Sequence, residues 1–424
     1  MRMWCHGYQS WSETAWRTAG GEVPAPRAPS LVQRMHDPEV ATMPGELHSE
    51  LVTMFDDDGT VYAGEGPLAL VDGELHGATA TFDSLDAWAA AQPGRTSAPF
   101  QIGWCSWYQY FDRVTEDDIR SNLARADAWP FDVFQVDDGF QSAIGDWLTT
   151  NDKFPSSLES LAADIARAGR RPGLWIAPFV AAPDSEVARS HPDWFATNRR
   201  GDRYVGMVND HWGGAVHVLD TTNPEVIAHL EQLARDLVAM GYTYLKLDFT
   251  YAPGLPATFQ VIAPARERVR RGFEAIRRGA GDNTFLLGCG APMASAIGIV
   301  DGMRIGPDVA PWWEPREHFP GYAAVAPSTV NALRATEARQ FMHRRLWLND
   351  PDCVMLRTTD TEMTREQVEQ WAVAVGNSGG MVLVSDDLAL LDADARALFD
   401  DVVARGREAD RQAIGSTSAR TNVR

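Results

Sequence analysis

Carboxylates recur along this 424-residue chain, and several of them stand directly after a short apolar run. The acids in such positions are Asp137, Asp138, Asp248, Asp308, Asp350, Asp352, Asp386 and Asp387. Like charges that share a cleft raise some carboxyl pKa values and leave other carboxyls ionised. One site can then supply both a proton donor and a nucleophile, the pair that hydrolysis of a glycosidic bond requires. Any single one of these acids could instead cap a helix N-terminus.

Asp248 is the stronger candidate for the ionised, attacking carboxylate. Lys246 stands two residues before it, and residues two apart in a strand project to the same side. A nearby ammonium group favours the charged form of a carboxylate. The sequence therefore predicts Asp248 as a nucleophile with Lys246 beside it.

Asp308 is the stronger candidate for the proton-donating acid. It follows Pro307 and precedes Trp312 and Trp313, whose apolar bulk would raise a carboxyl pKa. Arg304 lies four residues earlier and could hold a ring hydroxyl. We therefore predict Asp308 as the general acid.

A magnesium site is an alternative explanation for acids and a lysine at strand ends. The ten histidines form no HxH, HxxxH or HExxH pattern, which argues against an imidazole-rich metal site. Trp104, Trp107 and Trp175 suit the face of a sugar ring better than a hydrated ion. Packing in the core explains Trp104 at least as well. No metal or other cofactor is expected.

From residue 100 onward, short apolar segments alternate with longer segments of helical periodicity. Strands are expected at 100–107, 133–138, 171–179, 242–249, 284–290, 302–308, 344–350 and 380–387, and helices at 115–129, 158–169, 223–241 and 264–281. Eight strands with intervening helices predict a closed parallel (β/α)8 barrel of the TIM type, whose strand ends open on one face. A doubly wound open sheet is the alternative, but its GxGxxG turn after the first strand is missing.

The two ends of the chain differ from this central region. Residues 1–95 are expected to form a partial, β-sandwich-like antiparallel domain, with strands at 47–55, 60–65 and 78–84 and a Gly/Pro-rich loop at 20–30. The barrel is expected to span 96–390. Residues 391–424 are expected to form a terminal helix and a frayed polar tail, without a C-terminal β domain.

Composition limits the partners and the compartment. Lys and Arg number 38 and Asp and Glu 58, a net charge of −20, so nucleic acid and anionic membranes are not expected to bind. No apolar run approaches a membrane span, and no secretory signal is visible. The four cysteines are widely spaced, which argues against disulfides and thiolate zinc sites and predicts a reducing, cytoplasmic location.

Long motifs run in order through about residues 1–390. They are GWCSWYQYF (103–111), VFQVDDGFQSAIGDW (133–147), GLWIAPF (173–179), SHPDWF (190–195), YLKLDF (244–249), LLGCGAP (286–292), VDGMRIGPDVAP (300–311) and LWLNDPDC (346–353). Together they resemble glycoside hydrolase family 36, and in particular its compact, retaining bacterial α-galactosidases (melibiases). The resemblance implies a (β/α)8 barrel that removes terminal α-galactosyl groups by double displacement, with oligosaccharides of the melibiose or raffinose type as substrates.

The resemblance also implies roles for single residues. The aspartate of the family's K-x-D strand is its nucleophile, here Asp248, and that of its R-x-G-x-D motif is its acid/base, here Asp308. Further residues implied in substrate binding are Asp137, Asp138, Trp175, Lys246, Cys289, Arg304 and Trp11. The adjacent Asp137 and Asp138 would read the axial 4-hydroxyl of galactose. Trp11, in HGYQSWSE (6–13), would be a lid residue from the N-terminal domain.

The chain departs from the family at two places, and more than one function stays open. Family members carry a longer N-terminal β-sandwich and a C-terminal β domain, so both are expected to be short or missing here. Besides α-galactosidase, the chain could be an α-N-acetylgalactosaminidase or a galactosyl transferase of the same barrel. From another class, it could be a magnesium-dependent barrel enzyme or an inactive sugar-binding chain. The sequence predicts no oligomeric state.

Overall fold

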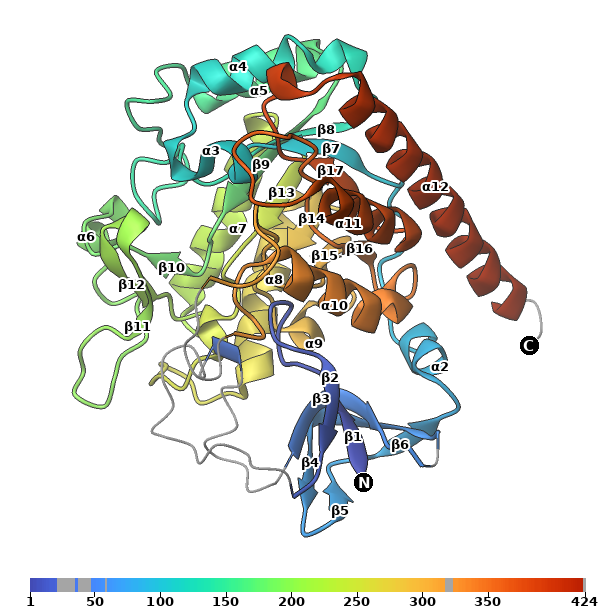
Figure 1. Cartoon of the computed structure of the whole chain (residues 1–424). Helices are drawn as coiled ribbons and strands as arrows, with labels where there is room; N and C mark the ends of the chain where they lie inside the picture. Colours follow the sequence, from blue (N-terminus) through green and yellow to red (C-terminus); the bar gives the residue numbers. More distant parts are fainter. Residues whose placement is uncertain (21–34, 37–46, 58, 317–322, 422–424) are drawn as a thin grey trace.

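The computed structural model describes residues 1–20, 35–36, 47–57, 59–316 and 323–421, with side chains up to residue 415. Beyond Gly20, the Gly/Pro-rich loop predicted at 20–30 lies outside these residues. Figure 1 shows a parallel sheet surrounded by helices, with a small antiparallel sheet near the N-terminus.

Eight parallel strands form the central sheet, and each lies within one of the eight segments predicted as a barrel strand. They are β7 (Ile102–Cys105), β8 (Val133–Val136), β9 (Arg171–Ile176), β13 (Tyr244–Leu247), β14 (Phe285–Gly288), β15 (Gly302–Arg304), β16 (Leu348–Asp350) and β17 (Val382–Val384). Their spatial order is β16-β15-β14-β13-β9-β8-β7-β17. The Met381 N–H, just before β17, donates to the Asn349 carbonyl of β16 at 2.8 Å. The sheet is therefore a nearly closed barrel, which confirms the predicted fold class.

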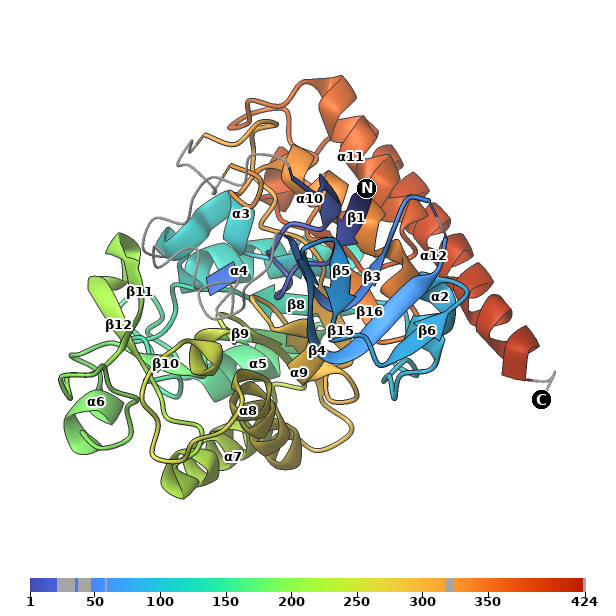
Figure 2. The same cartoon turned by 90° about the horizontal axis from the view of Figure 1, so that it is seen from below.

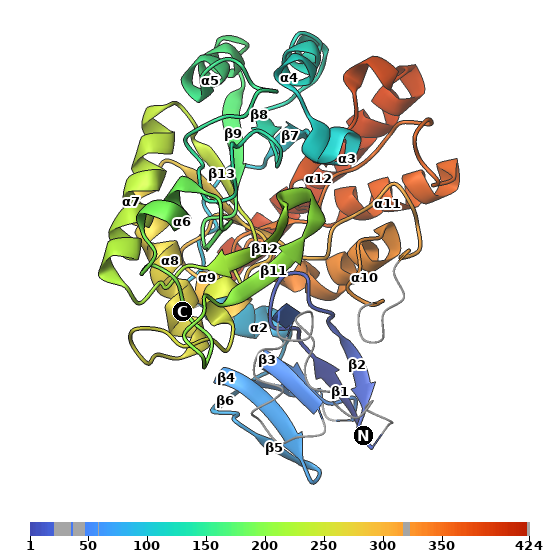
Figure 3. The ribbon, with the colours of Figure 1, turned by 90° about the vertical axis from the view of Figure 1, so that its left-hand side faces the viewer.

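Helices cover the outside of this barrel (Figure 3). The longer ones are α4 (Glu116–Leu123), α5 (Leu158–Arg167), α7 (Pro224–Ala239), α8 (Ala265–Ala280), α10 (Thr329–Arg339), α11 (Arg365–Asn377) and α12 (Ala393–Thr421). Shorter helices are α2 (Leu85–Ala90), α3 (Trp107–Tyr110), α6 (Glu186–Ser190) and α9 (Met293–Ala296), and 3-10 turns are η1 (Phe111–Arg113), η2 (Ala126–Ala128), η3 (Asp210–Trp212), η4 (Ala252–Gly254), η5 (Gln340–Met342) and η6 (Leu388–Leu390). The four predicted helices are present, although the segment 115–129 divides into α4 and η2. Helix α10 was not predicted, because polar residues such as Asn331 and Thr336 are buried along it and hide its apolar face.

Local capping residues set the starts of helices α4 and α7. Thr115 and Asp118 form a capping box at the start of α4, and Asn223 caps α7, with Pro224 in its first turn. These caps satisfy backbone N–H groups that have no partner inside the helix. Helices α4 and α7 thus begin at defined residues.

Two antiparallel regions flank the barrel (Figures 1 and 2). At the N-terminus, β1 (Arg2–Cys5) pairs with β2 (Ala15–Thr18), and a second sheet contains β3 (Leu47–Met54), β4 (Val61–Val71), β5 (Glu74–His76) and β6 (Ala80–Phe82). After β9, a three-stranded sheet of β10 (Val180–Ala181), β11 (Val205–Asn209) and β12 (Gly214–Val218) is inserted. In Figure 3 the β11–β12 hairpin lies in front of the barrel.

The C-terminal segment corrects one expectation. Residues 405–421, predicted to be a frayed tail, continue helix α12. Asp410 accepts hydrogen bonds from the buried Arg344 and His343, and these contacts hold the helix against the barrel past residue 405. Among the described residues, no helix is both long enough and apolar enough to cross a membrane.

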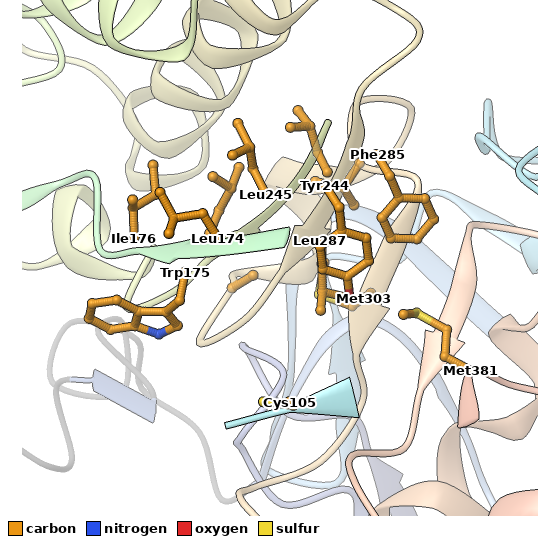
Figure 4. Packing of buried hydrophobic residues seen from close by; sticks show 14 of the residues in the cluster. Cys105, Leu174, Trp175, Ile176, Tyr244, Leu245, Phe285, Leu287, Met303 and Met381 are labelled. Atoms are coloured by element: carbon orange, nitrogen blue, oxygen red, sulfur yellow. The ribbon is translucent and has the colours of Figure 1, made fainter. Parts of the chain in front are cut away.

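The core lies inside the barrel and between its strands and helices. Alternate residues of each strand face opposite ways, so Trp175 and Ile176 leave β9 on opposite sides (Figure 4). All four residues of β13 are buried, including Lys246, which points into the barrel with Tyr244. A buried lysine needs a charge partner, and Lys246 has two carboxylates at the end of β13.

Candidate active site

The centre of the site is the end of strand β13. Lys246 Nζ lies 3.0 Å from Asp137 Oδ2 and 3.8 Å from Asp248 Oδ2. Burial alone would lower the pKa of Lys246, but the two carboxylates outweigh it and raise that pKa well above its usual range. Trp175 Nε1 donates to Asp248 Oδ2 at 2.9 Å, and the Phe249 N–H donates to Asp248 Oδ1 at 2.8 Å. These groups hold Asp248 in a fixed orientation.

The Asp137–Asp138 pair follows strand β8. Asp137 accepts from Lys246 and from the backbone N–H of Asp138. Asp138 Oδ1 accepts from Gln141, and its Oδ2 accepts from Trp212 Nε1, each at 2.7 Å. Burial raises the pKa of Asp138 to about 6, although both donors oppose this rise. The two neighbouring carboxyl groups therefore have different partners and different environments.

Arg304 joins three carboxylates at the ends of β15 and β16. Its Nη1 lies 3.0 Å from Asp308 Oδ1 and 2.8 Å from Asp352 Oδ2, and its Nε lies 3.1 Å from Asp350 Oδ2. Asp308 keeps 30% of its side chain exposed, whereas Asp350 and Asp352 keep 1% and 0%. Within this trio, Asp308 is the acid that a ligand can reach.

The environment of Asp308 raises the share of its protonated form near neutral pH. Its pKa is raised to about 7, mainly by burial, and the negative charges of Asp352 and Asp248 add to the rise while Arg304 opposes it. Asp352 in turn accepts a hydrogen bond from the Tyr108 hydroxyl. The site thus contains a charged lysine beside one carboxylate and a second carboxyl whose pKa is raised to about 7.

Several aromatic rings pack against one another beside Asp248. Trp175 is 1% exposed, and its indole N–H contacts Asp248 from the buried side. The ring centroids of Trp175 and Trp212 are 5.9 Å apart, and those of Trp212 and Phe249 are 4.8 Å apart. Trp11 packs on Phe249 with its ring centroid 5.0 Å away, so the N-terminal segment reaches the end of β13.

One further predicted residue, Cys289, lies at the same place, together with the glycine that follows it. Cys289 directly follows β14 and is fully buried, and burial together with the charge of Asp248 raises the pKa of its thiol well above the usual range. Gly290 follows with a φ of +51°, and a Cβ there would lie 2.8 Å from the Trp11 ring. A side chain at this position would therefore displace Trp11.

Not every predicted acid joins this group. Asp386 pairs with buried Arg357 at 2.7 Å, and Asp387 accepts from the Ala389 N–H and caps η6. Trp104 is fully buried in the core and donates to the Asp386 carbonyl. These residues therefore have structural roles: an ion pair for Asp386, a helix cap for Asp387 and core packing for Trp104.

Sequence reasoning missed two contributors, Trp212 and Tyr108. Trp212 lies in the turn between β11 and β12, where a pair of glycines at 213–214 is a hairpin signal. Tyr108 lies inside GWCSWYQYF, one of the motifs that carries the resemblance, yet its contact with Asp352 joins segments 244 residues apart. Among the described residues, no group of three or more His, Cys, Asp or Glu is arranged to hold a metal ion.

The barrel and its carboxylates place the chain among the (β/α)8-barrel glycosidases. A family model described as melibiase matches residues 97–252. The chain is 32% identical to the solved α-galactosidase TtGalA from Thermus thermophilus in complex with p-nitrophenyl α-D-galactopyranoside, covering 96% of this chain and 86% of that one, with a TM-score of 0.84. The TtGalA complex with stachyose gives a TM-score of 0.83, with 90% of that chain covered. This chain belongs to the glycoside hydrolase family 36 α-galactosidases, the melibiases.

Larger relatives match over part of their length. α-Galactosidase AgaA from Geobacillus stearothermophilus is 30% identical over 148 residues, which are 33% of this chain and 19% of AgaA. Its crystal structure, at 15% identity, gives a TM-score of 0.57 and is covered to 52%, which shows a shared fold. The chain therefore spans about half of the AgaA structure.

Proposed function

We propose that this protein is a retaining α-galactosidase that removes terminal α-linked galactose through a covalent galactosyl-enzyme. The observation that carries the proposal is the pairing of an oriented carboxylate with a carboxyl group whose pKa is raised. Asp248 lies beside charged Lys246, and Asp308 has a pKa near 7. The charge of Asp248 acts on Asp308, so the two groups share one site.

In the first step, Asp248 attacks the anomeric carbon while Asp308 gives its proton to the departing glycosidic oxygen. The hydrogen bonds from Trp175 and Phe249 restrain Asp248 in one orientation. In the second step, Asp308, now ionised, takes a proton from water, whose oxygen attacks the anomeric carbon and releases Asp248. Two inversions at that carbon give retention.

The other predicted residues are proposed to bind the sugar. Asp137 and Asp138 would accept from galactose hydroxyls, the axial 4-hydroxyl among them, and Lys246 would donate to a further hydroxyl. Trp11 and Cys289 would bound the pocket. Trp175 is buried, so its proposed role is to hold Asp248 through its indole N–H. Arg304 has its Nε and Nη1 on carboxylates, so its main proposed role is to orient Asp308.

The proposal extends to substrate class and location. α-Galactosides of the melibiose or raffinose type fit it, since stachyose is bound to TtGalA. An α-N-acetylgalactosaminidase or a galactosyl transferase would use the same two carboxylates and stays the second candidate. We propose a chemistry without metal, and a cytoplasmic location supported by four free cysteines. Nucleic acid and membrane surfaces are not proposed as partners of so acidic a chain.

A panel of aryl glycosides tests this function. We expect hydrolysis of the aryl α-galactoside with and without chelator, and poor hydrolysis of the matching α-glucoside and α-N-acetylgalactosaminide. The α-glucoside differs only at carbon 4, and a buried polar group that loses its hydroxyl partner gives a rejection of about 10⁴-fold in favourable cases. The measurement is kcat/KM for each substrate.

Three results would count against the account. Comparable rates on α-glucoside and α-galactoside would show that Asp137 and Asp138 do not read the 4-hydroxyl. Preference for the α-N-acetylgalactosaminide would favour the second candidate. Activity abolished by chelator would support a magnesium-dependent enzyme.

The pH profile should respond to Asp352, which shares Arg304 with Asp308. Asp352→Asn removes a negative charge beside Asp308 and a competing partner of Arg304 Nη1, which already pairs with Asp308, so the pKa of Asp308 should fall. Activity requires protonated Asp308 and is lost as pH rises through its pKa; the alkaline limb of kcat/KM should therefore move to lower pH by about one unit. Asparagine tolerates the left-handed backbone at this position (φ 93°).

A matched variant separates this effect from loss of a buried acid in general. Asp386→Asn also removes a buried carboxylate beside an arginine, Arg357, and it should leave the alkaline limb in place. An Asp352→Asn profile that stays unchanged or moves to higher pH would contradict the coupling.

A further inference from the structure

Arg339, the last residue of α10, is fully buried and donates to backbone carbonyls. Its Nη1 donates to the carbonyls of Ser10 and Ile305, and its Nη2 to those of Gln9 and Ser12. The distances to Ile305 and Ser12 are 2.8 and 2.7 Å. One side chain thus joins the segment 9–12 to the barrel.

Arg339 differs from the other buried arginines. Arg304, Arg344 and Arg357 all pair with carboxylates, whereas the structure shows no carboxylate partner for Arg339 among the described residues. Burial without a counter-charge lowers its pKa to about 9. A buried cation is costly unless its donors are satisfied. The four carbonyls take up Nη1 and Nη2 of Arg339, while its Nε is buried without a partner among the described residues, so these carbonyls are the groups that stabilise the charge.

Those carbonyls belong to two segments that border the active site. The first contains Trp11, whose ring packs on Phe249, the residue after Asp248. The Ser10 N–H also donates to the Ala291 carbonyl at 2.9 Å, so the segment lies along the loop that follows Cys289.

The second segment carries the proposed acid. Ile305 follows Arg304, and the N–H of Ser328, at the start of α10, donates to the Asp308 carbonyl at 3.0 Å. A Cβ at Gly306 would lie 3.0 Å from Ala335 Cβ, so α10 packs directly on this loop. Helix α10 therefore contacts the acid loop at its start and clamps the Trp11 segment at its end.

We propose that Arg339 is a positioning residue that holds Trp11 as one wall of the galactosyl pocket. The Trp11 indole N–H is buried, but the side chain as a whole is only partly buried, so its ring can contact a bound sugar. Without the clamp, this wall moves away from Phe249 and the sugar loses a contact, while Asp248 and Asp308 keep their own hydrogen bonds. This inference rests on the proposed function.

The test is a double-mutant cycle between Arg339→Met and Trp11→Ala, with p-nitrophenyl α-galactoside as substrate. Arg339→Met should raise KM by roughly 5- to 30-fold, the equivalent of one or two kcal/mol, and leave kcat nearly unchanged. Trp11→Ala should have a similar effect, and the double variant should add little, because both remove the same contact. Arg339→Lys, which keeps the charge, should give an intermediate KM and serves if the methionine variant does not fold.

Arg344→Met is the matched control. Arg344 is also buried and also holds backbone carbonyls, those of Thr96 and Ala98, but it pairs with Asp410. The Arg344→Met variant should have a lower free energy of unfolding and an unchanged KM. Hydrogen exchange of the amides at 8–14 should speed up in Arg339→Met and not in Arg344→Met.

Independent, additive effects of the Arg339 and Trp11 variants on KM, or an unchanged KM in Arg339→Met, would overturn the proposal. If the wild-type protein did not hydrolyse the α-galactoside at all, the proposed function would fail. The exchange measurement would then decide on the clamp by itself: faster exchange at 8–14 supports it, and unchanged exchange refutes it.

Discussion

Asp248→Gly should abolish turnover of every α-galactoside, by about 10⁴-fold or more, because the variant has no group to form the covalent intermediate. The fold should survive, since Lys246 keeps Asp137 at 3.0 Å as its charge partner. Azide added to the variant should restore part of the activity. It would occupy the face that Asp248 vacates, so the product should be the β-configured galactosyl azide.

Asp301→Asn is the matched control for this variant. Asp301 is a buried carboxylate that precedes β15 and pairs with Arg277 and Arg95, so its replacement should cost stability and leave the azide-independent rate in place. An α-configured azide product, or activity in Asp248→Gly close to that of the wild type, would exclude Asp248 as the nucleophile.

Asp308→Ala should show a strong dependence on the leaving group. A general acid contributes about 10²–10⁴-fold, and most when the leaving group is basic. Hydrolysis of melibiose or raffinose should therefore fall by that factor, whereas the first step with a nitrophenyl galactoside should be largely spared. The alkaline limb of the pH profile, near the Asp308 pKa of about 7, should flatten, because the group that loses its proton there is gone.

Equal losses on both kinds of substrate, together with a bell-shaped profile, would show that Asp308 is not the acid. The position of Asp352 sharpens this test. It also lies near Arg304, but its side chain is fully buried, so it should not be able to replace Asp308 as the proton donor.

The fold and the position of the site followed from local patterns in the sequence. Each apolar run that ends in an acid contains a barrel strand. Lys246 and Asp248, two residues apart, do point to the same side, with Lys246 Nζ 3.8 Å from Asp248 Oδ2. The partners of these side chains were harder to predict, because they come from distant segments. Trp212 reaches Asp138 from an inserted hairpin, across 74 positions of sequence.

The errors have one physical cause. A sequence pattern shows that an acid ends a strand, but not which cation it meets there. Asp386 pairs with Arg357 and lies outside the group of proposed catalytic carboxylates. Arg304 contacts three acids, which no spacing in the sequence indicates. Helix α12 was predicted to fray because its end is polar, yet Asp410 binds Arg344 and His343 of the barrel.

The most direct test of the central claim is to trap the intermediate and find the residue that carries it. The wild-type protein would be incubated with a fluorinated galactosyl fluoride, which forms the covalent intermediate faster than water can release it, then digested and analysed by mass spectrometry. The account predicts a single galactosyl ester on the peptide that contains YLKLDF (244–249), at Asp248. A label on the peptide with Asp308, or rapid turnover with no label and galactose first released in the β form, would contradict it.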